Sequence, residues 1–188
     1  VKGEGVMTYA EYDAAALESE VVVETYVQAK QSWWNDQATL YTQDKDGAYF
    51  IYNIACSEED YAKLNVGTKI KVTGYKAEWA GEVEIMDATI EVLEGSWLAP
   101  VLDVTDKLGT DELISFQNQK VAFKGLTVEA ANDDGAAFLY NWDGSGAEGT
   151  DSDLYFNASV NGQTYTFVIE YYLTGADSDA YKAVQALK

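Results

Sequence analysis

Hydrophobic and polar residues alternate along most of the first half of the chain, with the period of two that is typical of half-buried β-strands. The pattern is clearest over residues 20–28, where Val21, Val23, Thr25 and Val27 share one face. The same reading predicts strands over 38–43, 48–54, 68–75 and 82–92, and a short helix over 57–64 with Ser57 as its N-cap.

Three strands, a short helix and two more strands follow one another in the order of the OB-fold, a five-stranded Greek-key barrel. An SH3-like barrel lacks a helix at this place, and an immunoglobulin-like sandwich needs about seven strands. We therefore predict an all-β protein with short helices. The apolar residues of the last strand change parity between Ile85 and Ile90, which predicts a bulge or bend near Asp87.

Weak internal repeats predict a second copy of this barrel. We expect a first OB-like domain over 1–95, a linker over 96–103 with the only proline of the chain, and a second OB-like domain over 104–188. The second copy turns at Asn161-Gly162 and stops after a helix expected around 179–187, so two barrel strands have no sequence to form them. We expect this barrel to be incomplete, or to be completed by another segment. The repeats pair 20–24 with 120–124, 38–41 with 137–140, and 60–63 with 180–183.

The charge balance changes the range of expected partners. The chain has 32 acidic residues against 12 lysines, no arginine and no histidine, giving a net charge of −20. Phosphate binding rests on clustered basic side chains, and only Lys69, Lys71 and Lys76 form a local group. We expect that nucleic acid is an unlikely partner, that the protein is a soluble monomer, and that no segment spans a membrane.

The search for catalytic chemistry is mainly negative. Without histidine, and with Cys56 alone, the chain lacks the usual ligands of a zinc site and the base of a nucleophilic triad. Glu82 and Glu84 alternate at about 7 Å along one strand, but a solvated strand face is the favoured interpretation of that pair. We predict no catalytic residue, no enzymatic activity and no nucleotide cofactor.

Calcium is the one candidate metal that the acidic loops indicate, because hard cations prefer oxygen ligands. Asp143, Glu148, Asp151 and Asp153 place four carboxylates in one loop, although their spacing does not fit an EF-hand. The segment 44–47 is interpreted as an ordinary hairpin turn.

The run Tyr9-Ala10-Glu11-Tyr12-Asp13, followed by Val21-Val22-Val23 and the 44–47 hairpin, resembles the OB-like domains of secreted or lipid-anchored proteins from Gram-positive gut bacteria. Similar OB modules accompany extracellular sugar-non-specific nucleases. The resemblance covers residues 5–95 and, less strongly, 104–188. It implies an extracellular or cell-surface location and a non-catalytic accessory role, and it carries over no catalytic residue.

Aromatic residues mark the expected ligand site. OB-folds bind ligands across their second and third strands, between the loop that joins strands one and two and the loop that joins strands four and five. Two functions follow: a module that binds a glycan or a peptide through these rings, or a structural spacer of a cell-surface protein with no small ligand. The tryptophans alternatively plug a barrel end or a contact between domains. Trp33 and Trp34 fall in the first loop, Trp79 falls in the second, and Tyr41 and Tyr49 are expected in the floor.

Overall fold

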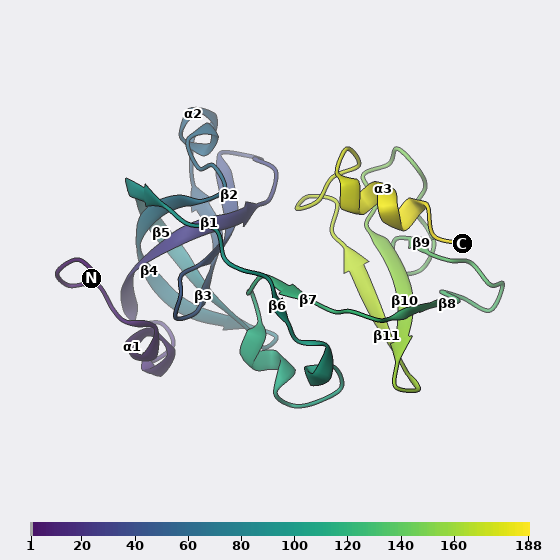
Figure 1. Cartoon of the computed structure of the whole chain (residues 1–188). Coiled ribbons are helices and arrows are strands. Elements are labelled where there is room, and N and C mark those ends of the chain that lie inside the picture. Colours follow the sequence, from purple (N-terminus) through teal and green to yellow (C-terminus); the bar gives the residue numbers. More distant parts are fainter. Residues whose placement is uncertain (1) are drawn as a thin grey trace. The chain divides into compact units, whose positions relative to one another are not determined.

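The computed structural model describes residues 2–188. The chain divides into two compact units on either side of the Ala122–Phe123 bond, unit 1 up to Ala122 and unit 2 over Phe123–Lys188. Unit 1 contains a closed barrel with neighbour order β1-β2-β3-β5-β4 (Figure 1). The OB-like barrel and its helix between β3 and β4 are thereby confirmed. The strands are β1 (Glu20–Lys30), β2 (Gln37–Gln43), β3 (Ala48–Ala55), β4 (Thr68–Trp79) and β5 (Glu82–Ser96), and the helix is α2 (Glu58–Ala62).

Alternate side chains of all five strands fill the barrel. Val23, Leu40, Ile51, Ile70 and Ile85 are fully buried there, one from each strand. Burial of each such side chain contributes about 1.5–3 kcal/mol. This alternation is the physical source of the pattern seen in the sequence.

The bulge predicted in the last strand is confirmed. Thr73 pairs with Thr89 but Tyr75 pairs with Met86, so the register between β4 and β5 shifts by one residue. Asp87 lies on the longer side of this shift with φ 51°. The extra residue there explains why the apolar face of β5 changes parity.

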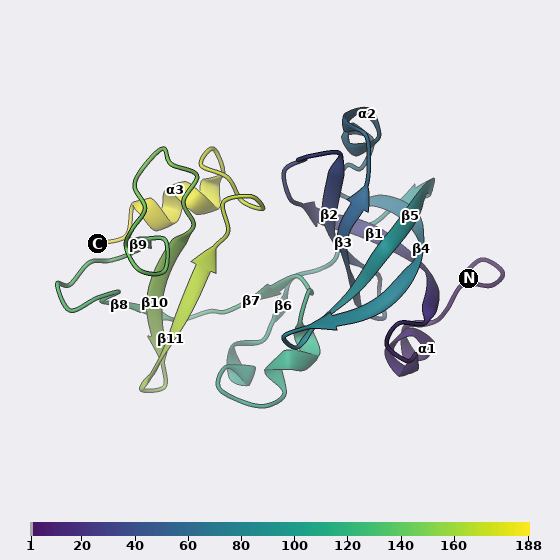
Figure 2. The ribbon, with the colours of Figure 1, turned by 180° about the vertical axis from the view of Figure 1, so that it is seen from behind.

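Helix α1 (Tyr9–Ala14) closes the barrel end opposite α2 (Figures 1 and 2) and was not predicted. It begins with a capping box, in which Thr8 and Glu11 exchange hydrogen bonds between side chain and backbone. Its buried Tyr12 lies with its ring centroid 4.9 Å from that of Tyr49 inside the barrel. The helix therefore acts as an apolar plug.

Lys76 of β4 holds α1 in place. Its ammonium group donates to the carbonyl oxygens of Tyr12, Asp13 and Ala15 at 2.9, 2.7 and 3.0 Å. These carbonyls lie at the C-terminal end of the helix, where the helix dipole favours a positive charge. Lys76 is consequently buried and does not belong to a basic surface group with Lys69 and Lys71.

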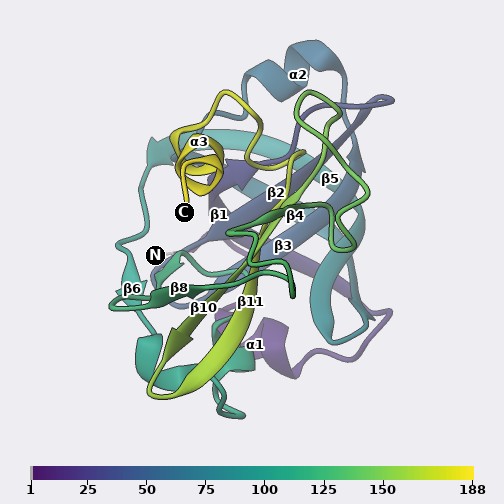
Figure 3. The ribbon, with the colours of Figure 1, turned by 90° about the vertical axis from the view of Figure 1, so that its right-hand side faces the viewer.

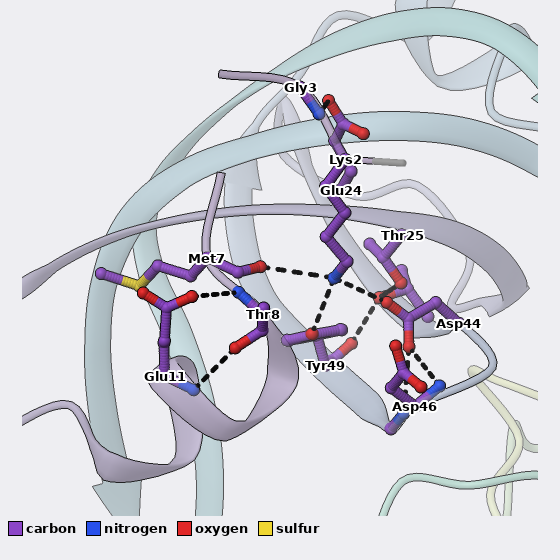
Figure 4. A network of polar contacts seen from close by, with 12 residues as sticks. Lys2, Gly3, Met7, Thr8, Glu11, Glu24, Thr25, Asp44, Asp46 and Tyr49 are labelled. Carbon is purple, nitrogen blue, oxygen red and sulfur yellow. Dashed lines mark hydrogen bonds and ion pairs between the residues drawn. The ribbon is translucent and has the colours of Figure 1, made fainter. Parts of the chain in front are cut away.

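A second lysine ties the N-terminal segment to the turn between β2 and β3 (Figure 4). The ammonium of Lys2 lies 2.8 Å from Asp44 Oδ2 and donates to the Met7 carbonyl at 3.3 Å. The other Asp44 oxygen accepts from the backbone N–H groups of Asp46 and Gly47 at 2.8 and 3.0 Å. Segment 44–47 is thus a hairpin turn, as expected.

Residues 97–122 pack on the barrel and belong to unit 1, which differs from the linker and domain start expected at 96–104. The side-chain oxygen Oε1 of Gln117 accepts from Val83 N–H at 3.0 Å, and Oε1 of Gln43 accepts from Lys120 N–H at 2.9 Å. These amide side chains satisfy backbone groups, a contact that hydrophobic periodicity does not reveal. The segment contains β6 (Leu102–Asp103), η1 (Thr105–Lys107), η2 (Leu113–Phe116) and β7 (Val121–Ala122), and β6 and β7 pair in parallel.

Unit 2 is an open sheet with neighbour order β11-β10-β8, in which β9 also pairs with β10. Asn161 and Gly162 turn the β10–β11 hairpin with φ 53° and 78°, as the sequence predicted. The elements are β8 (Thr127–Glu129), β9 (Leu139–Tyr140), β10 (Leu154–Val160), β11 (Gln163–Ile169) and α3 (Asp179–Gln185).

Helix α3 packs at the end of the hairpin away from its turn (Figures 1 and 3). Tyr181 and Val184 from α3 join Leu154 in the core of unit 2. Over residues 2–188, none of the helices is long and apolar enough to cross a membrane.

Replacing Lys76 by Met tests the brace on α1. The variant keeps the apolar stem but leaves one buried and two partly buried carbonyls without their charged donor, so we expect the free energy of unfolding to fall by about 2 kcal/mol. Urea denaturation measures the change. Lys71→Met, the same substitution on the same strand, is the control and is expected to alter stability by less than about 0.5 kcal/mol. Equal effects of the two substitutions would contradict the assigned role.

Candidate functional site

Three aromatic rings form a row on the outer side of β2 and β3. Along β3, Tyr49 and Ile51 enter the barrel core, so the intervening Phe50 and the following Tyr52 face outward. Tyr41 of β2 pairs with Phe50, and their ring centroids lie 4.8 Å apart. The rings of Phe50 and Tyr52 are 6.2 Å apart. We call Tyr41, Phe50 and Tyr52 the aromatic row.

Neither strand of this row carries a charged residue. The segments 37–43 and 48–55 contain no Asp, Glu or Lys, although 23% of the chain is charged. Phe50 is only 4% exposed, whereas Tyr52 is 37% exposed. Tyr52 therefore supplies the most exposed ring of this uncharged face, and Phe50 is packed among its neighbours.

The tryptophans predicted for the bordering loops differ in exposure. Trp34 and Trp79 are each 72% exposed, in the β1–β2 loop and at the end of β4. Trp33 is half-buried, and its indole N–H donates to the Cys56 carbonyl at 2.9 Å. Two of the three rings are thus available to a ligand, and the third anchors its loop.

Tyr49 is misplaced in the sequence-based site. It is fully buried, with its ring centroid 5.6 Å from that of Tyr9 and 4.9 Å from that of Tyr12. Burial is the main cause that raises the pKa of its phenol. Tyr49 supports the barrel end, and the outward positions of β3 belong to Phe50 and Tyr52, which the sequence analysis missed.

A hollow of about 180 Å³ lies on the other side of the barrel, against β1 and β4. Tyr26 and Trp97 line it with ring centroids 5.7 Å apart. Four of its charged groups already form ion pairs, since Lys69 Nζ lies 3.7 Å from Glu24 Oε2 and Lys2 pairs with Asp44. A charged ligand would have to displace these ion pairs, so the aromatic row is the better candidate site.

A polar cavity of about 210 Å³ lies beneath α1 and is lined by Tyr12, Val83 and Gln117 among others. Within residues 2–188, the hydroxyl of Tyr12 is the one buried side-chain polar atom without a hydrogen-bond partner. Glu84 of β5 is buried as well, and loss of solvation raises the pKa of its carboxyl. The interpretation of Glu84 as a solvated strand residue is therefore wrong.

The four carboxylates considered for calcium serve separate local roles. Asp143 accepts from the Ser145 N–H at 3.0 Å, and this contact lowers its pKa. Asp153 accepts from the Tyr171 N–H at 2.8 Å, while Asp151 has φ 55° and Glu148 is exposed. Across the described chain, no three acidic or sulfur-bearing side chains lie close enough to hold a metal ion. The loop does not bring the four residues together.

No protein-family model and no curated protein matches the chain. Similar solved structures include the HINb domain of p204, at 12% identity, TM-score 0.39 and 47% coverage of each chain. A murine DNA-binding protein bound with double-stranded DNA has 8% identity and TM-score 0.37, over 78% of this chain and 72% of that one. The HINa domain of Ifi202 with a 20-bp double-stranded DNA has 12% identity and TM-score 0.34, over 80% and 77%. This chain spans about half the length of the first.

Two of these structures hold double-stranded DNA, against the sequence-based predictions of a glycan or peptide ligand and an unlikely nucleic-acid partner. Those predictions are corrected, and neither they nor the spacer alternative is kept. The prediction rested on the net charge of −20 and the scarcity of clustered lysines, whereas β2 and β3 carry no charged residue. At these identities and TM-scores, the likeness assigns no ligand to this chain.

The raised pKa of Glu84 predicts a stability that depends on pH. A carboxyl whose pKa is higher in the folded state binds more protons there than in the unfolded state, so stability falls as pH rises through the folded pKa. We expect Glu84→Gln to be more stable than the wild type at pH 7, and the difference to vanish below the unfolded pKa of about 4.3. Denaturation at several pH values measures this, with the exposed Glu78→Gln as control. An unchanged difference from pH 7 to pH 4 would contradict the assignment.

Proposed function

We propose that this chain is a non-catalytic binding module whose aromatic row holds the bases of a single-stranded nucleic acid. The observation that carries the proposal is the contact of three aromatic rings on the uncharged outer side of β2 and β3. This is the face that binds oligonucleotides in OB-folds. Stacking of a base on an aromatic side chain contributes about 1–3 kcal/mol.

The exposure of the rings favours a single strand. Tyr52, Trp34 and Trp79 present accessible ring surface, and Phe50 supports the row from a buried position. A base exposes its flat face to a side chain only when it is not stacked inside a duplex. Unpaired bases therefore fit this surface better than an intact double helix.

The acidic charge sets the kind of affinity to expect. Three of the twelve lysines, Lys2, Lys69 and Lys76, are engaged in contacts within unit 1 and are not available to phosphates. A net charge of −20 repels a polyanion at long range. Binding on this proposal rests on stacking, and salt acts mainly by screening the repulsion.

The proposal also covers the nature of unit 2, the absence of catalysis and the cellular location. Unit 2 is interpreted as a second, incomplete OB-like domain, because its hairpin β10–β11 directly precedes α3 as the hairpin β2–β3 precedes α2. The absence of histidine supports a role without catalysis, and no cofactor is invoked. The cell-surface location and the likeness to modules of Gram-positive bacteria stay predictions.

Removing one exposed ring tests the site. We expect Tyr52→Ala and Trp34→Ala each to raise the Kd for a fluorescent oligothymidine roughly 5- to 150-fold, as the loss of one stacking contact requires. Fluorescence anisotropy measures the Kd for the single strand. The Kd for a double-stranded oligonucleotide, measured in the same way, is the comparison. Tyr75→Ala, an exposed tyrosine on β4, is the matched control. If the wild type fails to bind, or if Tyr75→Ala weakens binding as much, the proposal is wrong.

Salt dependence tests the stacking mechanism separately. A protein that neutralises several phosphates loses affinity steeply with salt, with a logarithmic slope of about −0.7 per phosphate for single strands. We expect a slope close to zero or positive here. Anisotropy titrations at increasing salt measure the slope, and a value steeper than about −2 would show that lysines, and not rings, supply the affinity.

A further inference from the structure

Unit 2 has an aromatic cavity of its own. A hollow of about 300 Å³ lies against β10 and the loop that precedes it. Trp142, Tyr155 and Leu139 supply its ring and apolar walls, and Asn157 and Thr166 supply polar groups. None of the side chains that line it is charged, in a unit that has ten acidic residues and three lysines.

Trp142 is displayed by a fixed loop. Its side chain is 75% exposed, and exposure of so large an apolar ring is unfavourable unless the ring packs or binds. On one side, Asn141 N–H donates to the Asp153 carbonyl at 2.8 Å, and Asn141 Oδ1 accepts from Asp153 N–H at 3.2 Å. These two bonds hold the residue before Trp142 beside the start of β10.

Asn157 offers one donor and one acceptor beside the rings. Its Oδ1 accepts from the Thr166 hydroxyl at 2.7 Å, and its Nδ2 donates to the Ala130 carbonyl at 3.0 Å. An amide has two N–H groups and two oxygen lone pairs, so one of each remains. A side-chain amide with this pair matches the N6–H and N7 edge of adenine.

The strands that carry the cavity share the charge pattern of the aromatic row. The segments 154–160 and 163–169 contain no Asp, Glu or Lys, as do 37–43 and 48–55 in unit 1. The two hairpins also hold the same place in the order of strands before a helix, α3 or α2. Charge is therefore excluded from the strands of the corresponding hairpin in each unit.

We infer that unit 2 carries a second, separate site for a purine base, with Trp142 and Tyr155 as stacking surfaces and the Asn157 amide as the hydrogen-bonding group. The uncharged lining favours a neutral heterocycle over a phosphate or another ion. This inference rests on the proposed function, since it names a base as the ligand of a different place in the chain. The experiment that tests it nevertheless measures signals of Trp142 and Asn157 in unit 2, and not those of the aromatic row in unit 1.

Titration of the full chain with adenosine, followed by NMR, tests the site. We expect the indole signal of Trp142 and the side-chain amide signals of Asn157 to shift together, and Trp142→Ala to weaken this binding roughly tenfold. Because Trp142 is exposed, the variant should keep the wild-type thermal midpoint. Tyr172→Ala, another exposed ring of unit 2, is the control and should leave the binding unchanged.

The outcomes separate this inference from the proposed function. If adenosine shifts Trp34 and the aromatic row but not Trp142, the second site is overturned and the proposed function stands. If it shifts Trp142 and Asn157 and leaves unit 1 unchanged, the second site stands and the role of the aromatic row is contradicted. If Trp142→Ala binds adenosine as the wild type does, the second site is overturned.

Discussion

Closure of the five-stranded barrel is the constraint on which the arrangement of unit 1 depends. Each strand must send every second side chain inward, and on β3 this places Tyr49 inside and Phe50 outside. The end of the barrel at Tyr49 then needs a lid, which α1 supplies with Tyr9 and Tyr12. Lys76 holds this lid by donating to carbonyls at the C-terminal end of α1. Its ammonium group therefore stabilises the closed barrel and is not available to a partner.

Local charge carries more information here than net charge. The chain is strongly acidic, yet its charges avoid the two hairpins 37–55 and 154–169 except at the β2–β3 turn, where Asp44, Lys45 and Asp46 lie. Asp44 is itself neutralised by Lys2 at 2.8 Å. An acidic surface with uncharged aromatic strands repels polyanions at a distance but leaves stacking contacts intact, because stacking acts only over a few ångströms.

The strands and α2 could be predicted because each has one apolar and one polar face, or a clear N-cap at Ser57. The floor of the site could not, since Ala48 to Ile51 is a continuous apolar run and period two then gives no inward side. Helix α1 is too short for periodicity to register, although Thr8 and Glu11 carried its capping signal. The packing of residues 104–122 depends on amide contacts from Gln117 and Gln43, which are visible only in three dimensions.

Exposed tryptophans are the feature that the two units share beyond their strand order. Trp34 and Trp142 both precede the first strand of a hairpin whose strands carry no charge, and both lie in loops fixed by backbone hydrogen bonds. Trp34 and Gln37 bond each other at 3.0 and 3.3 Å, and Asn141 bonds Asp153. A ring held in this way loses little conformational entropy when a ligand stacks on it, so affinity does not require a large contact area. Folding alone explains the exposed positions of Trp34 and Trp142 poorly, because a rigid loop that served only the fold would place its largest apolar side chain inward. Trp33 is an example of such an inward ring, and its indole N–H donates to the Cys56 carbonyl.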